Sequence, residues 1–265
     1  YAPSIALAYG VARPIATRKE NNFSLRAEDI EKVISPRTKV LMLNFPTNPT
    51  GAILLPEDAK KIAALCVKHN IVVLTDEIYS ELTYDDAPRV SIATMPGMKE
   101  RTVFMHGMSK AFAMTGWRIG YACAPAELIE AMMKIHQYSI LCAPIMGQEA
   151  AIEALEHGAA GVEHMRAEYL LHRNYIVRSF NDLGLHCPKP HGAFYIFPDI
   201  TSTGLDSKTF ALELLRTKKV AVVPGTAFGM SGEGHIRCSY ATGLEQIKIA
   251  TSRIAEFCAE LPRKN

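Results

Sequence analysis

The chain lacks any long hydrophobic run and any excess of charge of one sign. Its longest aliphatic runs, such as residues 71–74, fall far short of the ~20 apolar residues that a membrane-spanning helix needs. The 29 basic and 27 acidic residues leave a formal net charge of +2, which provides no basic field for nucleic acid. We therefore expect no membrane and no nucleic acid among its partners. Hydrophobic residues make up 48% of the 265 residues, which excludes a mainly disordered chain.

Paired cysteines and metal-type histidine spacings are also missing. The six cysteines lie far apart with no Cys-x-x-Cys, and the nine histidines include no His-x-x-x-His. This pattern is typical of reduced, mostly buried thiols in a cytoplasmic protein, and we expect no metal site. The N-terminal residues Tyr1-Ala2-Pro3-Ser4 show no basic segment leading into an apolar one, so they indicate no signal peptide.

The first half of the chain alternates strand and helix patterns. Apolar runs predict buried strands at 40–43, 71–74 and 102–105, and residues 56–69 have a helical pattern with a proline in the first turn. This alternation predicts an α/β fold with a mostly parallel sheet flanked by helices on both faces. Ligands of such sheets bind outside the carboxyl ends of the strands.

The second half has a different character. Helix-forming residues dominate 127–183, with breaks near Pro144 and at residues 157–158. After residue 185, short strands are interleaved with helices; we expect strands at 194–197, 220–223 and 235–239, and helices at 208–217 and 244–261. We therefore predict a large domain over residues 1–165 and a smaller C-terminal α+β domain over residues 166–265.

One candidate motif for chemistry is Ser109-Lys110, which follows a predicted strand and precedes Arg118 by eight residues. Arg118 stands between Trp117 and Ile119, and an arginine in an apolar setting needs a counter-charge that a phosphate can supply bidentately. Taken alone, a lysine after a strand is usually a solvated surface residue. Arg118 alone fits a pairing with a carboxylate equally well.

Two further motifs also follow strands. In Asp76-x-x-Tyr79, both side chains would lie on one side if a helix began there, although an N-cap aspartate is the more common explanation in isolation. In the segment from Asn44 to Gly51, two X-Pro steps form a rigid loop that presents the amide of Asn48. A purely structural turn has the same composition.

Together these motifs resemble the class I/II aminotransferases, which are fold-type-I enzymes that use pyridoxal 5'-phosphate (PLP). The resemblance covers essentially the whole chain and rests on Asn48-Pro-Thr-Gly, Asp76-x-x-Tyr79, Ser109-Lys110, Gly116-Trp117-Arg118-x-Gly120, Gly192-Ala193-Phe194-Tyr195, and Arg237 within residues 235–239. Gly107 and the amino-acid sequence of residues 114–118 are similar to those of the bacterial and archaeal aspartate/aromatic branch of the family.

The resemblance implies a PLP-dependent transferase-like fold and a role for each matching residue. Lys110 would be the catalytic residue, holding the cofactor covalently and moving the substrate's proton. Arg237 would clamp the substrate's α-carboxylate, with Asn48 beside it. The cofactor would be bound by Asn48, Asp76, Tyr79, Ser109, Lys110 and Arg118.

The activity implied is transfer of an amino group between an α-amino acid and a 2-oxo acid, in a homodimer, with aspartate or aromatic substrates favoured. Two alternatives stay open: a PLP-dependent β-lyase on the same scaffold, and the aminotransferase-like effector-binding domain of a transcription regulator. The family's phosphate-binding loop and ring-stacking aromatic have no counterpart in these 265 residues. We therefore expect the C-terminal part of a subunit, with weak PLP binding on its own.

Overall fold

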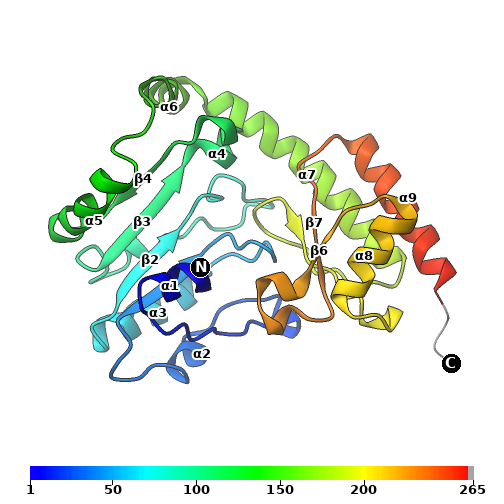
Figure 1. The fold of residues 1–265 in the computed structure, drawn as a ribbon, viewed down its shortest axis with the longest axis horizontal. Coiled ribbons are helices and arrows are strands. Elements are labelled where there is room, and N and C mark those ends of the chain that lie inside the picture. The colour runs from blue at the N-terminus through cyan, green and yellow to red at the C-terminus, as the bar shows by residue number, and fades with distance from the viewer. Residues whose placement is uncertain (262–265) are drawn as a thin grey trace.

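The computed structural model describes residues 1–261 and contains two sheets with helices around them (Figure 1). The helices are α1 (Ala2–Leu7), α2 (Ala27–Glu31), α3 (Pro56–Lys68), α4 (Met108–Ala111), α5 (Ala126–Ser139), α6 (Ile145–His157), α7 (Ala159–Asp182), α8 (Ser207–Lys218) and α9 (Leu244–Glu260). The strands are β1 (Val40–Asn44), β2 (Val72–Asp76), β3 (Thr102–Gly107), β4 (Gly120–Cys123), β5 (Tyr195–Ile196), β6 (Val223–Pro224) and β7 (Ile236–Ser239). Short 3-10 helices occur at Lys19–Asn21, Ile92–Thr94, Thr115–Trp117, Thr201–Thr203, Gly225–Phe228 and Met230–Gly232.

The larger sheet has the strand order β1-β2-β3-β4. Its first three strands are parallel, and β4 is antiparallel to β3. The predicted strands are confirmed, each displaced or extended at its ends by no more than two residues. The register places Asn44 beside Asp76 at the carboxyl ends of β1 and β2, so two polar side chains of the motifs share one edge of the sheet.

One face of this sheet packs against α3. Leu41, Leu43 and Val73 alternate with less buried residues along their strands and share a core with Ile62 of α3. Pro56 stands in the first turn of α3, as predicted, where its missing N–H costs no helical hydrogen bond. The chain therefore forms an α/β fold in which a mostly parallel sheet is flanked by helices.

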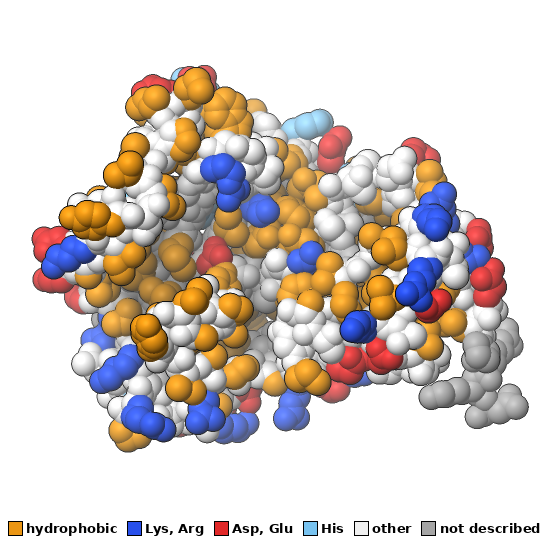
Figure 2. Space-filling view, viewed as in Figure 1, with side chains coloured by type: hydrophobic (Ala, Val, Ile, Leu, Met, Phe, Trp, Pro, Cys, Tyr) orange, Lys and Arg blue, Asp and Glu red, His pale blue; other side chains and the backbone are white. Residues whose placement is uncertain are grey.

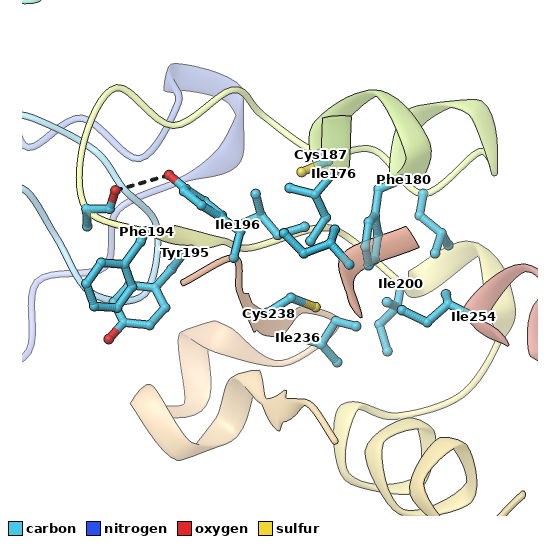
Figure 3. Close-up of a cluster of buried hydrophobic side chains, with 14 of the residues drawn as sticks. Ile176, Phe180, Cys187, Phe194, Tyr195, Ile196, Ile200, Ile236, Cys238 and Ile254 are labelled. Carbon is cyan, nitrogen blue, oxygen red and sulfur yellow. Dashed lines mark hydrogen bonds between the residues drawn. The ribbon is translucent and has the colours of Figure 1, made fainter. Parts of the chain in front are cut away.

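The smaller sheet has the order β5-β7-β6, with antiparallel pairing throughout. Its core contains Ile196 and Ile236 from the strands, Ile176 and Phe180 from α7, and Ile254 from α9 (Figure 3). The strand predicted at 220–223 is displaced. Only residues 223 and 224 pair with β7, so the preceding valines pack against the core without a strand partner.

The helical segment between the two sheets breaks where the sequence predicts. Pro144 precedes α6, and Gly158 separates α6 from α7. Figure 1 shows α7 running from the neighbourhood of α4 and α6 to α9. The predicted domain boundary at residue 165 lies inside α7 and stays a prediction.

All six cysteines are free, as predicted, but only Cys66, Cys187 and Cys238 are buried. Within residues 1–261, no helix is long and apolar enough to cross a membrane.

Candidate functional site

The loop that carries Asn48 is fixed by Asn44 at the end of β1. The side-chain amide of Asn44 donates to the carbonyl of Asp76 at 3.0 Å, and its oxygen accepts from the backbone N–H of Asn48 at 3.1 Å. Gly51 closes the same loop at φ +69°, where a Cβ atom would lie 2.2 Å from Pro190. The carbonyl of Gly51 accepts backbone N–H groups from residues 191 and 192 at 3.0 Å each. The loop is thereby joined to the segment that carries Phe194 and Tyr195.

Arg237 on β7 reaches Asn48 from the other sheet. Its Nη1 donates to Oδ1 of Asn48 at 2.9 Å. Its guanidinium carbon lies 4.6 Å from the centre of the Tyr195 ring and 5.1 Å from that of Phe228. The Nε atom is buried without a hydrogen-bond partner within residues 1–261. A planar cation held by two rings, with a donor left over, is suited to a carboxylate.

Asp76 is the last residue of β2 and Tyr79 lies in the turn that follows, so the helix that we considered there is absent from this segment. The reason is local: Oδ1 of Asp76 accepts from the backbone N–H of Ile78 at 3.2 Å, which stabilises a turn. The other carboxylate oxygen of Asp76 accepts the hydroxyl of Tyr1.

The Tyr79 side chain is buried against Phe194 and Tyr195. Its hydroxyl lies 3.1 Å from that of Tyr195. Burial, followed by this hydrogen bond, raises the pKa of Tyr79 well above its usual value. The phenol therefore keeps its proton at neutral pH and can donate a hydrogen bond.

Ser109 and Lys110 lie in α4, a single turn directly after β3. The turn starts where the backbone of β3 comes close to that of β4: a Cβ atom on Gly107 would lie 2.9 Å from the carbonyl oxygen of Ile119. Both side chains are half-buried. The Lys110 ammonium lies 5.8 Å from the centre of the Phe194 ring, and within residues 1–261 it forms no ion pair with a carboxylate.

The apolar environment that we predicted for Arg118 is not found in the structure. Its side chain is exposed, and Nη1 donates to the carbonyl of Thr115 at 2.8 Å. The residue adopts a left-handed backbone conformation, φ +58°, which turns it away from its buried neighbour Ile119. It borders an open cavity of about 380 Å³, lined also by Ala113, Gly116, Trp117, Pro144, Met146 and Gly147. Within residues 1–261, no hydrogen bond or ion pair joins the Arg118 side chain to the other predicted site residues.

The side chains of five predicted residues form one connected group, namely Asn48, Asp76, Tyr79, Lys110 and Arg237. Successive contacts lead from Lys110 through an aromatic cluster to Arg237, and from there through the asparagine loop to Asp76. Sequence reasoning assigned no role to several members of this group: Tyr1, Asn44, Phe194, Tyr195 and Phe228. Asn44, Phe194 and Tyr195 lie in motifs that stood out in the sequence, whereas Tyr1 and Phe228 lie outside them. Only long-range contacts in the structure show that these residues belong to the site.

This fold and this site define an α/β protein in which contacts connect a half-buried lysine, a carboxylate and an arginine beside the end of a mostly parallel sheet. The comparison with known proteins then gives the family. Residues 1–254 match the family described as aminotransferase class I and II. The chain belongs to this family.

Three relatives illustrate the similarity. YugH of Bacillus subtilis, named as an aminotransferase, is 50% identical over 257 residues, covering 97% of this chain and 66% of YugH. Aromatic-amino-acid aminotransferase 2 of Thermococcus litoralis is 44% identical over 262 residues, covering 98% and 67%. The structure of aspartate aminotransferase from Thermus thermophilus with maleate has a TM-score of 0.92 at 39% identity, covering 97% and 66%. The chain spans about two thirds of the length of the curated relatives that it matches.

Proposed function

We propose that the protein is a PLP-dependent aminotransferase that moves an amino group between an α-amino acid and a 2-oxo acid. The observation that carries this proposal is the placement of Arg237. Its guanidinium lies close to two aromatic rings, donates a hydrogen bond to Asn48, and has one buried donor without a partner within residues 1–261. A free carboxylate is the ligand that satisfies such a donor set.

The residues present fit PLP. Oδ2 of Asp76 accepts a hydrogen bond from the Tyr1 hydroxyl, and a carboxylate oxygen that accepts this donor can equally accept the N–H of a protonated pyridine ring. Tyr79 and Asn48 are hydrogen-bonding groups for the ring's phenolic oxygen. Ser109 and the exposed guanidinium of Arg118 are the groups for the phosphate. When bound, the cofactor supplies an electron sink for the negative charge formed at the substrate's α-carbon.

Lys110 is the residue that we assign to covalent attachment and proton transfer. Its amine is half-buried above Phe194 and is not engaged by a carboxylate within residues 1–261. After it loses its proton, this amine can act as a nucleophile and can accept and return a proton. A carboxylate held in a fork by Arg237 would fix the direction of the α-hydrogen relative to Lys110.

Aspartate and aromatic amino acids are the substrates that we propose. The names of the relatives support this choice, since aromatic and aspartate aminotransferases occur among those at 39–44% identity. Each of these substrates carries the α-carboxylate that Arg237 is built to bind.

We also propose that a second copy of the chain covers α5. None of the residues of α5 is buried, although the helix carries apolar side chains such as Ile135 and Tyr138, which are 72% and 86% exposed. Figure 2 shows hydrophobic side chains gathered over α1, α5 and α6 on this face of the molecule. Burying such a patch is the usual basis of a stable homodimer.

The experiment that tests the proposed activity is a transamination assay with added PLP. Aspartate, tyrosine and phenylalanine serve as amino donors, each with a 2-oxo acid acceptor. We expect the 2-oxo acid of the donor to appear in equal amount to the new amino acid. Release of ammonia and an α,β-eliminated product instead would indicate a β-lyase and contradict the proposal.

A further inference from the structure

Phe194 and Tyr195 form an aromatic surface shared by the two central residues of the site. Phe194 lies beneath Lys110, and Tyr195 lies against Arg237 and Tyr79. The two rings are 4.7 Å apart, centre to centre. The backbone at residues 193–195 therefore determines where the two rings lie against the lysine and the arginine.

Ala193, the residue just before these rings, has an unusual environment. It is fully buried and adopts φ +59°, a left-handed conformation that residues with a Cβ disfavour. Its carbonyl oxygen accepts two tyrosine hydroxyls, that of Tyr84 at 2.6 Å and that of Tyr240 at 3.1 Å. These tyrosines come from the segment after β2 and from the end of β7, so two distant parts of the chain meet at one carbonyl.

Backbone hydrogen bonds extend the same connection. The N–H of Ala193 donates to the carbonyl of Leu82 at 2.9 Å, and the N–H of Tyr84 donates to that of His191 at 2.9 Å. On the other side, the N–H of Tyr240 donates to the carbonyl of Phe194 at 3.0 Å. The segment 191–194 is thus held like a short strand between its two neighbours.

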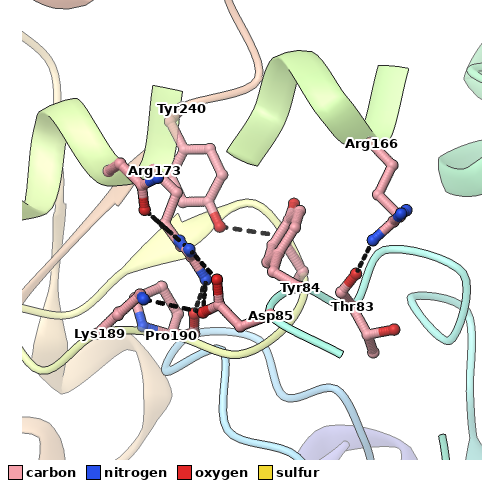
Figure 4. Close-up of polar contacts among 10 residues, drawn as sticks. Thr83, Tyr84, Asp85, Arg166, Arg173, Lys189, Pro190 and Tyr240 are labelled. Atoms are coloured by element: carbon pink, nitrogen blue, oxygen red, sulfur yellow. Dashed lines mark hydrogen bonds and ion pairs between the residues drawn. The ribbon is translucent and has the colours of Figure 1, made fainter. Parts of the chain in front are cut away.

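Arg173 on α7 packs against the ring of Tyr84 (Figure 4). It is fully buried and donates to both carboxylate oxygens of Asp85, at 2.7 and 2.9 Å, and to the carbonyl of Pro190 at 3.1 Å. Its guanidinium carbon lies 5.0 Å from the centre of the Tyr84 ring. Lys189 adds a second cation to Asp85 at 2.9 Å.

We propose that Tyr84 and Tyr240, supported by Arg173, are positioning residues that hold the Phe194–Tyr195 surface in place beneath Lys110 and Arg237. This inference rests on the proposed function for its catalytic consequence. Burial raises the pKa of both tyrosines, so both hydroxyls stay protonated and act as donors. Without these hydroxyls, the buried carbonyl of Ala193 loses the two hydrogen bonds that it accepts from Tyr84 and Tyr240.

The test uses the full chain with Tyr84→Phe, with Tyr240→Phe and with both changes together. Each change removes one hydroxyl and little volume. Tyr175→Phe is the control, because it removes the same hydroxyl from a partly buried tyrosine whose hydroxyl faces Thr251, at 3.5 Å. Amide hydrogen exchange is measured by mass spectrometry on the peptide that contains residues 191–196.

We expect exchange in residues 191–196 to accelerate about five- to thirtyfold in the tyrosine variants, since a lost buried hydrogen bond shifts local opening by that much. The control should leave these amides unchanged. If one single variant does not fold, the other carries the same measurement. Unchanged exchange in the folded tyrosine variants, or equal acceleration in Tyr175→Phe, would overturn the proposal.

Catalysis supplies a second readout. Tyr240→Phe should lower kcat/KM for amino acids by about ten- to hundredfold, because small displacements in an active site cost that much. In a protein that already carries Phe194→Leu, Tyr240→Phe should lower kcat/KM by a much smaller factor than it does alone. If the two substitutions instead lower kcat/KM by the product of their separate factors, a role exerted through Phe194 is contradicted. If the unsubstituted protein lacks transaminase activity, the proposed function fails, and hydrogen exchange alone decides the positioning role.

Discussion

Arg237 and Asn48 are 189 positions apart in the sequence, yet the arginine Nη1 and the asparagine Oδ1 are joined by a 2.9 Å hydrogen bond. This bond connects the strand β7 of the smaller sheet with the loop after β1 of the larger one. It also orients the guanidinium, whose buried Nε has no hydrogen-bond partner within residues 1–261. The site is therefore built across the two sheets and depends on both.

The first prediction concerns Arg237→Lys. Lysine keeps the charge but loses the planar fork, so we expect kcat/KM for amino acids to fall about 10²- to 10³-fold while the cofactor stays bound. The measurement is steady-state kinetics with an amino acid and with an amine that lacks a carboxylate. Arg216→Lys on the exposed face of α8 is the control. An equal loss for both substrates would mean that Arg237 has only a structural role.

A second prediction concerns Asp76→Asn. The variant keeps the shape but loses the charge that would pair with a protonated ring nitrogen, so PLP should bind more weakly and kcat should fall about a hundredfold or more. Glu77→Gln is the matched control, because Glu77 is bonded to Thr75 and Ser91 rather than to the site residues. Titration with PLP followed by absorbance, together with kcat, separates the two variants. Equal effects would argue against the role of Asp76.

A third prediction is a pH dependence of stability. Burial raises the pKa of Asp199, but hydrogen bonds from Lys19 and Thr201 outweigh this effect and lower it to about 2. A lowered folded-state pKa stabilises the protein above the unfolded value of about 3.8, and this contribution is lost as the pH falls through the folded value. Asp199→Asn should therefore reduce the free energy of unfolding by about 1–3 kcal/mol at pH 7.

The difference between Asp199→Asn and the unsubstituted protein should shrink as the pH is lowered from about 4 towards 2. Urea unfolding at several pH values measures it. Asp182→Asn, which alters an exposed ion pair with Arg178, should change stability by less than about 0.5 kcal/mol. A difference for Asp199→Asn that stays constant down to pH 2 would contradict the assignment.

A fourth prediction concerns association through α5. Ile135→Lys places a charge in the exposed apolar face and should shift the chain towards monomers in sedimentation experiments. Ile249→Lys, at a 44% exposed position on α9, is the matched control and should leave association unchanged. If both variants associate as the unsubstituted chain does, another surface forms the dimer.

Local patterns were sufficient to predict much of the fold. The apolar runs at 40–43 and 102–105 lie within β1 and β3, and the proline and glycine positions predict the breaks around α6, because these signals act within a few residues. The short strand β6 was misplaced, since only its pairing with β7 defines it. Its two residues carry no local pattern of their own.

The site was predictable to a similar extent. The motifs identify Asn48, Lys110 and Arg237, and contacts in the structure connect all three. The contact of the Tyr79 hydroxyl with Tyr195 and the exposed side chain of Arg118 were not foreseen, because a long-range hydrogen bond and a left-handed backbone depend on tertiary context. The buried Arg173 gave no signal in the sequence for the same reason.

The most direct test of the central claim is to find which lysine binds PLP. The protein is incubated with PLP, reduced with borohydride and mapped by peptide mass spectrometry, with Lys110→Ala as the control. We predict that the pyridoxyl group is found on Lys110, and that the variant loses both this label and nearly all transamination, because attachment and proton transfer use the same amine. Specific labelling of another lysine, or a Lys110→Ala variant that retains full activity, would contradict the account.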